Sequence, residues 1–220
     1  MTNCQCEGIE ACFNPRLAAQ ELDHYRKKGA AKSTRRLITA LEAEGVAGMT
    51  LLDIGGGVGA IPHALLRDGV NTAMAVDAST AYLDVARDEA QRRGLGDRIL
   101  FEHGNFVELA PNIPPADIVT LDRVLCCFDD VSALVSASVA RATHLYGLVY
   151  PRAFWLLRAF TRAHAAFARL TGSQMRFFVH APAAVEAIVR GQGFERRHYE
   201  TVGLWQVIVY ARRSSAGPIG

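Results

Sequence analysis

The stretch LLDIGGGVGAIPHALL, residues Leu51 to Leu66, places four glycines within five positions at the end of an apolar run. Glycine loses more conformational freedom on ordering than any other residue, so such a cluster needs a reason. An apolar strand that runs into a glycine-rich turn and then a helix is typical of a nucleotide site. The turn lets a ligand approach the backbone, and the helix N-terminus presents N–H donors.

Outward from this loop, short apolar segments alternate with helical ones. We expect strands at 49–54, 72–77, 98–103, 116–121 and 144–150, and helices at 17–28, 32–44, 58–67, 80–93, 131–143, 154–170 and 183–190. The last two apolar segments, 194–202 and 204–210, are separated by Gly203 and predict a pair of antiparallel strands at one edge of the sheet. The alternation predicts an α/β fold, a doubly wound and mostly parallel sheet with helices on both faces.

Composition narrows the functional classes. The 220 residues are enough for one domain, and a net charge of +2 with scattered arginine pairs gives no reason to expect a nucleic-acid partner. We expect neither a signal peptide nor a membrane span, and therefore no membrane partner. The five cysteines are an odd number and two of them are adjacent, which favours reduced thiols and a cytoplasmic protein.

Two acidic residues indicate which nucleotide the loop binds. Asp77 ends the next strand, about 20 residues beyond the loop, where a carboxylate accepts hydrogen bonds from ribose hydroxyls. Asp53 precedes Gly55 by two residues, where it repels a pyrophosphate and favours a cationic ligand. The glycine spacing also fits a dinucleotide, so an NAD-dependent oxidoreductase remains the alternative. Asp53 and the absence of a recognisable Tyr-x-x-x-Lys pair count against it.

The sequence resembles the class I methyltransferases, which use S-adenosyl-L-methionine. The resemblance is carried by DIGGGVG (53–59), Asp77, HGNF (103–106) and ADIVTLDRVL (116–125). It implies a seven-stranded sheet whose last strand is antiparallel. The cofactor-binding residues that we expect are Tyr25, Asp53, Gly55, Gly57, Gly59, Asp77, Ala78, Asn105, Phe106 and Leu121. Asn105 departs from the family, in which Asp is more frequent; its carbonyl still offers an acceptor for the adenine amino group.

Residues 12–41 resemble, more distantly, the magnesium-protoporphyrin O-methyltransferases. That group usually has Cys at the second glycine of the loop, where this chain has Gly56. The resemblance implies O-methylation of a small molecule. We expect residues 1–30 to form a helical lid, and residues 31–220 to form the methyltransferase domain, with a cap inserted at about 152–180. Aromatic residues in the cap favour an apolar or planar acceptor.

The acceptor should lie beyond the carboxyl ends of the first and fourth strands. Asp122 and Arg123 stand at the end of the fourth strand and are catalytic candidates. Asp122 is a candidate base or acceptor-orienting group, although an ion pair with Arg123 explains it equally well. His180 is a further catalytic candidate, with a structural role as its alternative. Cys126, Cys127 and Trp155 are candidate substrate contacts.

The cysteines leave a further reading open. Cys4, Cys6 and Cys12 form C-x-C-x₅-C, which is not the usual zinc spacing, so no metal site is predicted. If the N-terminal segment folds over the site, its thiols and those of Cys126 and Cys127 could converge on a soft ion or metalloid, and the acceptor would be sulfur or a metalloid. The alternative is that the adjacent cysteines are small buried hydrophobic residues. A non-catalytic binding module, as a monomer or homodimer, is also compatible with the sequence.

Overall fold

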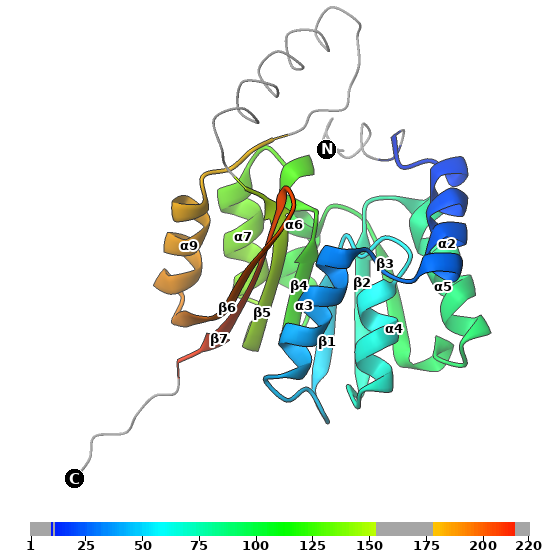
Figure 1. The fold of residues 1–220 in the computed structure, drawn as a ribbon, viewed down its shortest axis with the longest axis horizontal. Helices are drawn as coiled ribbons and strands as arrows, with labels where there is room; N and C mark the ends of the chain where they lie inside the picture. Colours follow the sequence, from blue (N-terminus) through cyan, green and yellow to red (C-terminus); the bar gives the residue numbers. More distant parts are fainter. Residues whose placement is uncertain (1–9, 11, 153–177, 214–220) are drawn as a thin grey trace, which may run out of the picture.

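The computed structural model describes residues 10, 12–152 and 178–213. Their core is a seven-stranded sheet with the order β3-β2-β1-β4-β5-β7-β6 (Figure 1). The strands are β1 (Thr50–Ile54), β2 (Thr72–Asp77), β3 (Ile99–His103), β4 (Ala116–Asp122), β5 (Ala142–Pro151), β6 (Phe194–Val202) and β7 (Trp205–Arg212). β7 runs antiparallel to both of its neighbours, and the other pairings are parallel. The predicted fold class is therefore confirmed.

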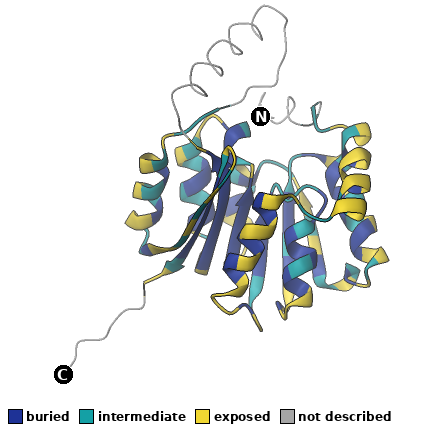
Figure 2. Ribbon diagram, in the orientation of Figure 1, coloured by how far each residue is buried: buried dark blue, intermediate teal, exposed yellow. Residues whose placement is uncertain are grey.

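Helices cover both faces of the sheet. They are α2 (Pro15–Lys28), α3 (Lys32–Glu42), α4 (Ala60–Arg67), α5 (Thr80–Arg92), α6 (Phe106–Leu109), α7 (Val131–Val139) and α9 (Pro182–Gly191). Adjacent strand residues face opposite layers, since Leu51 packs in the cluster under α3, α4 and α5, whereas Leu52 packs under α6, α7 and α9. With both faces covered, the central strands are buried along most of their length (Figure 2).

The strand order positions the site. After β1 the chain builds outward through β2 and β3, and it then crosses to the other side of β1 to add β4. The crevice beyond the carboxyl ends of strands at such a reversal is where open α/β sheets bind ligands. Gly55, Asp77, Gly104 and Arg123 each follow or end one of these four strands.

Several predicted boundaries differ from the structure by one to four residues, and two of these differences are informative. The helix expected from residue 58 begins at Ala60, because Gly57 and Gly59 have left-handed φ angles of 56° and 82°. The helix expected over 131–143 ends at Val139, and β5 begins at Ala142, which pairs with Ala116. Alternating alanine, serine and valine mark no helix end, so the sequence did not locate this boundary.

The helix predicted at 154–170, and with it most of the cap, lies outside the described residues. None of the helices in the described part of the chain has the length and apolarity that crossing a bilayer requires.

Candidate functional site

The glycine loop is shaped by close contacts as well as by backbone angles. Gly55 has φ 65°, and a Cβ atom there would lie 2.5 Å from Val124 Cγ2. Gly56 needs no left-handed angle, but a Cβ atom there would lie 2.0 Å from Asp53 Oδ2. Gly57 has a left-handed φ of 56°, and a Cβ atom there would lie in ordinary van der Waals contact with the Tyr82 ring, at 3.6 Å. The loop therefore exposes backbone to the cavity.

Asp53 lies under the loop rather than in the cavity. Its side chain is fully buried, Oδ1 accepts a 2.6 Å hydrogen bond from Thr120 Oγ1, and Oδ2 has no hydrogen-bond partner among the described residues. Burial raises the pKa of Asp53 to about 7. Asp53 is thus not among the residues that line the cavity, and burial disfavours its charged form at neutral pH.

Asp77 ends β2 and lines the cavity. Its Oδ1 accepts a 2.9 Å hydrogen bond from the Ser79 backbone N–H, and the Ser79 hydroxyl caps α5 through the Tyr82 N–H. Burial raises the pKa of Asp77 to about 6, and backbone N–H donors at Ser79, Gly57 and Ala78 oppose the shift. The carboxylate is therefore ionised at neutral pH and fixed in direction.

The first helix forms a wall of the site. Residues of α2 pack with Val58 and Tyr82 in a small apolar cluster of their own. Phe13, just before α2, meets Tyr82 edge to face at 5.7 Å between ring centroids, and its carbonyl oxygen accepts a hydrogen bond from Ser79 Oγ. Tyr25 also lines the cavity, and its hydroxyl lies 3.4 Å from Nδ1 of the buried His63.

A buried carboxylate holds α2 on α5. The Glu89 side chain is fully buried and is bonded by Arg92 and Arg93 of its own helix region. Arg26 of α2 adds a third ion pair at 2.8 Å. The three guanidinium groups lower the pKa of Glu89. The cluster joins the wall of the site to the domain by charge-assisted bonds to one acceptor.

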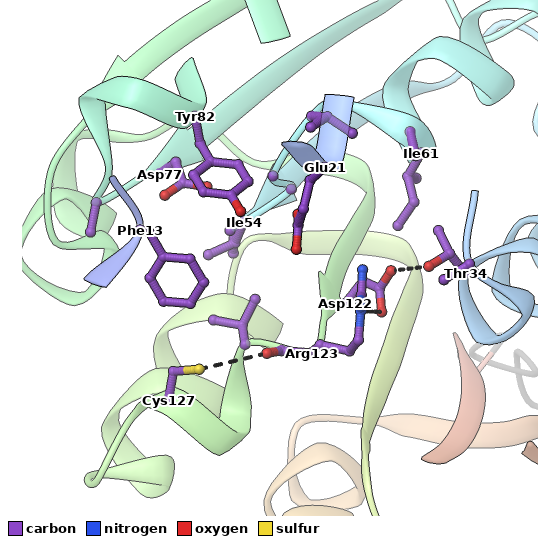
Figure 3. A pocket seen from close by; sticks show the side chains of 18 of the residues that line it. Phe13, Glu21, Thr34, Ile54, Ile61, Asp77, Tyr82, Asp122, Arg123 and Cys127 are labelled. Carbon is purple, nitrogen blue, oxygen red and sulfur yellow. Dashed lines mark hydrogen bonds and ion pairs between the residues drawn. The ribbon is translucent and has the colours of Figure 1, made fainter. Parts of the chain in front are cut away.

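These elements enclose a cavity of about 710 Å³ (Figure 3). Its polar side chains come from α2, α3, α5 and the segments that end or follow β2, β3 and β4: Gln20, Glu21, His24, Tyr25, Thr34, Asp77, Tyr82, Asn105, Asp122, Arg123, Cys126 and Cys127. Arg123 is the one arginine or lysine among the described lining residues. The volume falls in the range of sites that hold small molecules and cofactors.

Asp122 and Arg123 lie together at the end of β4, and Thr34 reaches them from α3 (Figure 3). Thr34 Oγ1 donates to Asp122 Oδ2 at 2.5 Å, and Arg123 Nε donates to Oδ1 at 3.3 Å. Burial raises the pKa of Asp122, while the Arg123 charge and the Thr34 hydrogen bond act against that shift. The ion pair that the sequence left open exists, and the carboxylate still faces the cavity.

Arg123 has a strained backbone. Its φ of 62° is the one positive value among the described non-glycine residues. Such angles cost free energy for residues with side chains and concentrate at functional sites. A 2.7 Å hydrogen bond from the Arg123 N–H to the Val149 carbonyl oxygen holds this conformation.

His180 hydrogen-bonds backbone carbonyl oxygens, which is the arrangement expected of its structural alternative. Its Nε2 lies 2.8 Å from the Leu125 carbonyl oxygen and 2.9 Å from the Phe128 carbonyl oxygen, so Nε2 carries the proton and donates. His180 is not among the residues that line the cavity. With the Phe178 N–H, which donates to the Cys126 carbonyl oxygen, it ties the chain at 178–180 to the turn η3 (Leu125–Cys127).

The other expected cofactor residues divide into two groups. Gly55, Gly57, Ala78, Asn105 and Phe106 line the cavity, whereas Gly59 and Leu121 do not. Gly59 is the N-cap of α4, and Leu121 is wholly buried in the core.

Asn105 caps a helix, and two of the substrate candidates line the cavity. Asn105 Oδ1 accepts from the Val107 N–H as the cap of α6, and its amide nitrogen donates to Glu108. The oxygen assigned to adenine therefore already has one partner. Cys126 and Cys127 line the cavity, as expected of substrate contacts. Trp155 lies outside the described residues, as do Cys4 and Cys6.

Sequence reasoning missed several polar residues that line the cavity, and Thr34 and Glu21 are two of them. Thr34 occupies the buried face of α3 with Leu37, Ile38 and Leu41, so a hydroxyl on an otherwise apolar stripe was the available signal. Glu21 of α2 points toward the cavity between Tyr82 and Asp122 (Figure 3). No feature of the sequence distinguished it from the other charges of that helix.

Comparison with known proteins agrees with the geometry. Residues 52–149 match the model of a family described as "Methyltransferase domain". A curated relative, the ribosomal protein L11 methyltransferase of Erwinia tasmaniensis, is 27% identical over 117 residues, which is 53% of this chain and 39% of that protein. The chain thus matches about two fifths of the length of this relative.

Solved structures share the fold. Magnesium protoporphyrin IX methyltransferase of Synechocystis PCC 6803, solved with bound SAH, superimposes with a TM-score of 0.68 at 19% identity and covers 83% of each chain. An O-methyltransferase family protein of Burkholderia thailandensis gives 0.65 at 19% identity and covers 83% of this chain and 57% of that one. Both comparisons place the chain in the Rossmann-like methyltransferase fold.

Proposed function

We propose that the protein, whose residues 52–149 match a methyltransferase domain and whose fold is that of the Rossmann-like methyltransferases, transfers a methyl group from S-adenosyl-L-methionine to a small molecule. The observation that carries the proposal is the pairing of the open glycine loop with the ionised Asp77 in one cavity of about 710 Å³. The same cavity reaches the end of β4, so donor and acceptor fit side by side.

The residues present suit this cofactor. Asp77 offers a carboxylate to two ribose hydroxyls, and Gly57 leaves the backbone open to the ligand. The unpartnered Oδ2 of Asp53 lies beneath the loop, where a cationic ligand would stabilise the ionised carboxylate and a pyrophosphate would not. The bound cofactor supplies an activated methyl group on a sulfonium. The protein supplies alignment and the exclusion of water.

Oxygen is the acceptor atom that we propose. Asp122 faces the cavity from the end of β4, and Thr34 and Arg123 hold its two oxygens in place. A hydroxyl of the acceptor that donates to Asp122 would be held for in-line attack, and the carboxylate would take up its proton. The apolar lining from Phe13, Phe106 and Phe128 suits an acceptor with an apolar body.

The α2 helix acts as the lid in this proposal. It carries Glu21 and Tyr25 into the cavity and is fixed to α5 by Arg26. A ligand that enters beneath α2 would be shielded from water once the helix is seated.

Calorimetry tests the cofactor assignment. We expect S-adenosylmethionine and S-adenosylhomocysteine to bind to the purified protein, and NAD to bind weakly or not at all. Asp77→Asn should weaken binding at least tenfold, because it removes the charge from two hydrogen bonds. Asp84→Asn is the matched control on α5, where an exposed carboxylate pairs only with Arg87. Tight NAD binding with no response to S-adenosylmethionine would refute the proposal.

Activity requires a separate experiment. Cell extract incubated with the protein and isotope-labelled S-adenosylmethionine should yield labelled small molecules, detected by mass spectrometry. Asp122→Asn should reduce labelling and leave the cofactor affinity unchanged. Labelling that persists undiminished in Asp122→Asn would exclude the proposed role of that carboxylate.

A further inference from the structure

Two adjacent cysteines form a distinct feature of the cavity that methyl transfer to oxygen does not use. Cys126 and Cys127 belong to the turn η3 that follows β4, and both line the cavity. Their sulfur atoms are 3.8 Å apart, and both lie near the Arg123 carbonyl oxygen, at 3.1 and 3.9 Å. The two sulfurs thus converge on one side of the turn, although neighbouring side chains commonly point apart.

The turn that carries the two thiols is held in place. The Phe178 N–H bonds the Cys126 carbonyl oxygen, and His180 Nε2 bonds the carbonyl oxygens on either side, at Leu125 and Phe128. Because these bonds fix the backbone of η3, the approach of the two sulfurs does not depend on a mobile loop. A pair of donors that is held together loses less entropy on binding one atom between them.

The spacing fits one soft bridging atom. With bonds to sulfur of about 2.3 Å, the length of a zinc–thiolate bond, a single atom spans two sulfurs up to about 4.6 Å apart. The observed 3.8 Å lies within that reach. Thiolate ligands select soft ions and metalloids over hard cations.

The two cysteine sulfurs suit an ion or metalloid that needs only two ligands from the protein. In the described part of the chain, no three side chains of His, Cys, Asp or Glu gather in the arrangement that a metal ion needs. Four-coordinate zinc would therefore lack partners here. A trivalent arsenical with one organic group needs only two sulfurs.

The pKa shifts of the two thiols also favour an adduct in which neither sulfur atom carries a charge. Cys126 is almost fully buried, and its hydrogen bond with Cys127 and burial both raise the pKa of its thiol. The same hydrogen bond lowers the pKa of Cys127, and the Arg123 guanidinium acts in the same direction. One thiol is thus activated as the first nucleophile, while a lasting charge on both sulfurs is disfavoured. An arsenical bound through two sulfurs carries no charge.

We propose that Cys126 and Cys127 form a dithiol site for trivalent arsenicals at the β4 end of the cavity. With phenylarsine oxide, two S–As bonds form and the As=O bond breaks. Both thiol protons leave with the oxygen as water, and arsenic stays trivalent. The site is independent of methyl transfer, and its test uses no cofactor.

The test protein is the full chain with Cys4→Ser, Cys6→Ser and Cys12→Ser, which leaves only the adjacent pair of thiols. Reduced and freed of reductant, it should take up one phenylarsine unit from phenylarsine oxide, with loss of one water molecule, by intact-protein mass spectrometry. Excess monothiol should leave the adduct in place, because one S–As bond holds the arsenic while the other is broken and lets that bond re-form. A small dithiol should remove it.

Adding Cys127→Ser to that background should reduce retention in the presence of monothiol at least tenfold. Cys126→Ala serves as a second variant, and circular dichroism verifies that each stays folded. Failure of the three-serine protein to take up the arsenical would overturn the proposal, as would equal retention by the Cys127→Ser protein. Neither result bears on S-adenosylmethionine binding.

Discussion

The carboxyl group of Asp53 occupies the space that a side chain on residue 56 would need, since a Cβ atom on Gly56 would lie 2.0 Å from Asp53 Oδ2. The glycine is therefore required by a buried carboxylate beneath the loop, and its own backbone angle does not demand it. Any side chain at residue 56 would need a different placement of this acid.

Gly56→Ala should destabilise the protein. The added methyl group overpacks the space above Asp53, and overpacking a filled site typically costs about 1–3 kcal/mol. Urea denaturation measures the free energy of unfolding. Gly191→Ala is the control, because no atom lies within 4 Å of a Cβ at that helical position. Equal stability of the two variants would show that the loop adapts to a side chain.

Asp53→Asn should make the free energy of unfolding less dependent on pH. Burial raises the pKa of Asp53 from 3.8 to about 7, so the folded protein holds this proton more tightly than the unfolded chain does. The stabilisation is complete below about pH 4 and is lost as the pH rises through 7. At about 1.4 kcal/mol per pKa unit, the loss approaches about 4 kcal/mol. Denaturation at pH 4 and pH 8 should show the variant gaining on the wild type as the pH rises.

Arg26→Ala should loosen α2. It removes the one ion pair that joins this helix to Glu89, while Arg92 and Arg93 still neutralise the carboxylate. Hydrogen exchange across Pro15–Lys28 should become faster, with a global loss of about 1 kcal/mol or less because Arg26 is partly exposed. Lys27→Ala is the matched control, since Lys27 pairs only with Asp23 of the same helix. Identical exchange in both variants would show that Arg26 does not anchor the lid.

Thr34→Val should shift the pH dependence of methyl transfer. The Thr34 hydrogen bond opposes the effect of burial on the pKa of Asp122, so its loss should raise that pKa further. The acid limb of the kcat profile should move to higher pH, with unchanged S-adenosylmethionine affinity. Thr39→Val, on the exposed face of α3, is the control. A profile that does not move would limit Thr34 to a packing role.

His180→Ala should lower stability by about 1 kcal/mol and leave S-adenosylmethionine affinity intact. The imidazole bonds two backbone carbonyl oxygens and lies outside the cavity lining, so its loss leaves those oxygens to water. Thermal denaturation and calorimetry on one preparation measure both quantities. A loss of S-adenosylmethionine affinity without a loss of stability would show that His180 contributes to the binding site.

The fold was predictable because its signals are local. The glycine loop, the acid that ends β2 and the alternation of strands and helices each occupy a few consecutive residues. β2 agrees with its predicted bounds, residues 72–77. Signals of this kind depend on neighbouring residues and little on the rest of the fold.

The site was predictable only in part, because distant segments build it. Asp122 and Thr34 are 88 positions apart, and no pattern in the chain pairs them. His180 looked available for chemistry because its acceptors, two backbone carbonyl oxygens, carry no mark in the sequence. Asp53 and Leu121 were placed correctly along their strands, but their burial depends on the layers above them.

The bonds on either side of residues 153–177 have a consequence for the length of that segment. The Arg152 N–H is tied to the Leu204 carbonyl oxygen, and the Phe178 N–H is tied to the Cys126 carbonyl oxygen beside the cavity. Both ends of the intervening segment are thus secured by the sheet and the turn, independently of what lies between them. Lengthening a segment between fixed ends costs little, since closure entropy grows only with the logarithm of its length. Changes in the length of that segment should therefore cost little stability and leave the rest of the domain in place.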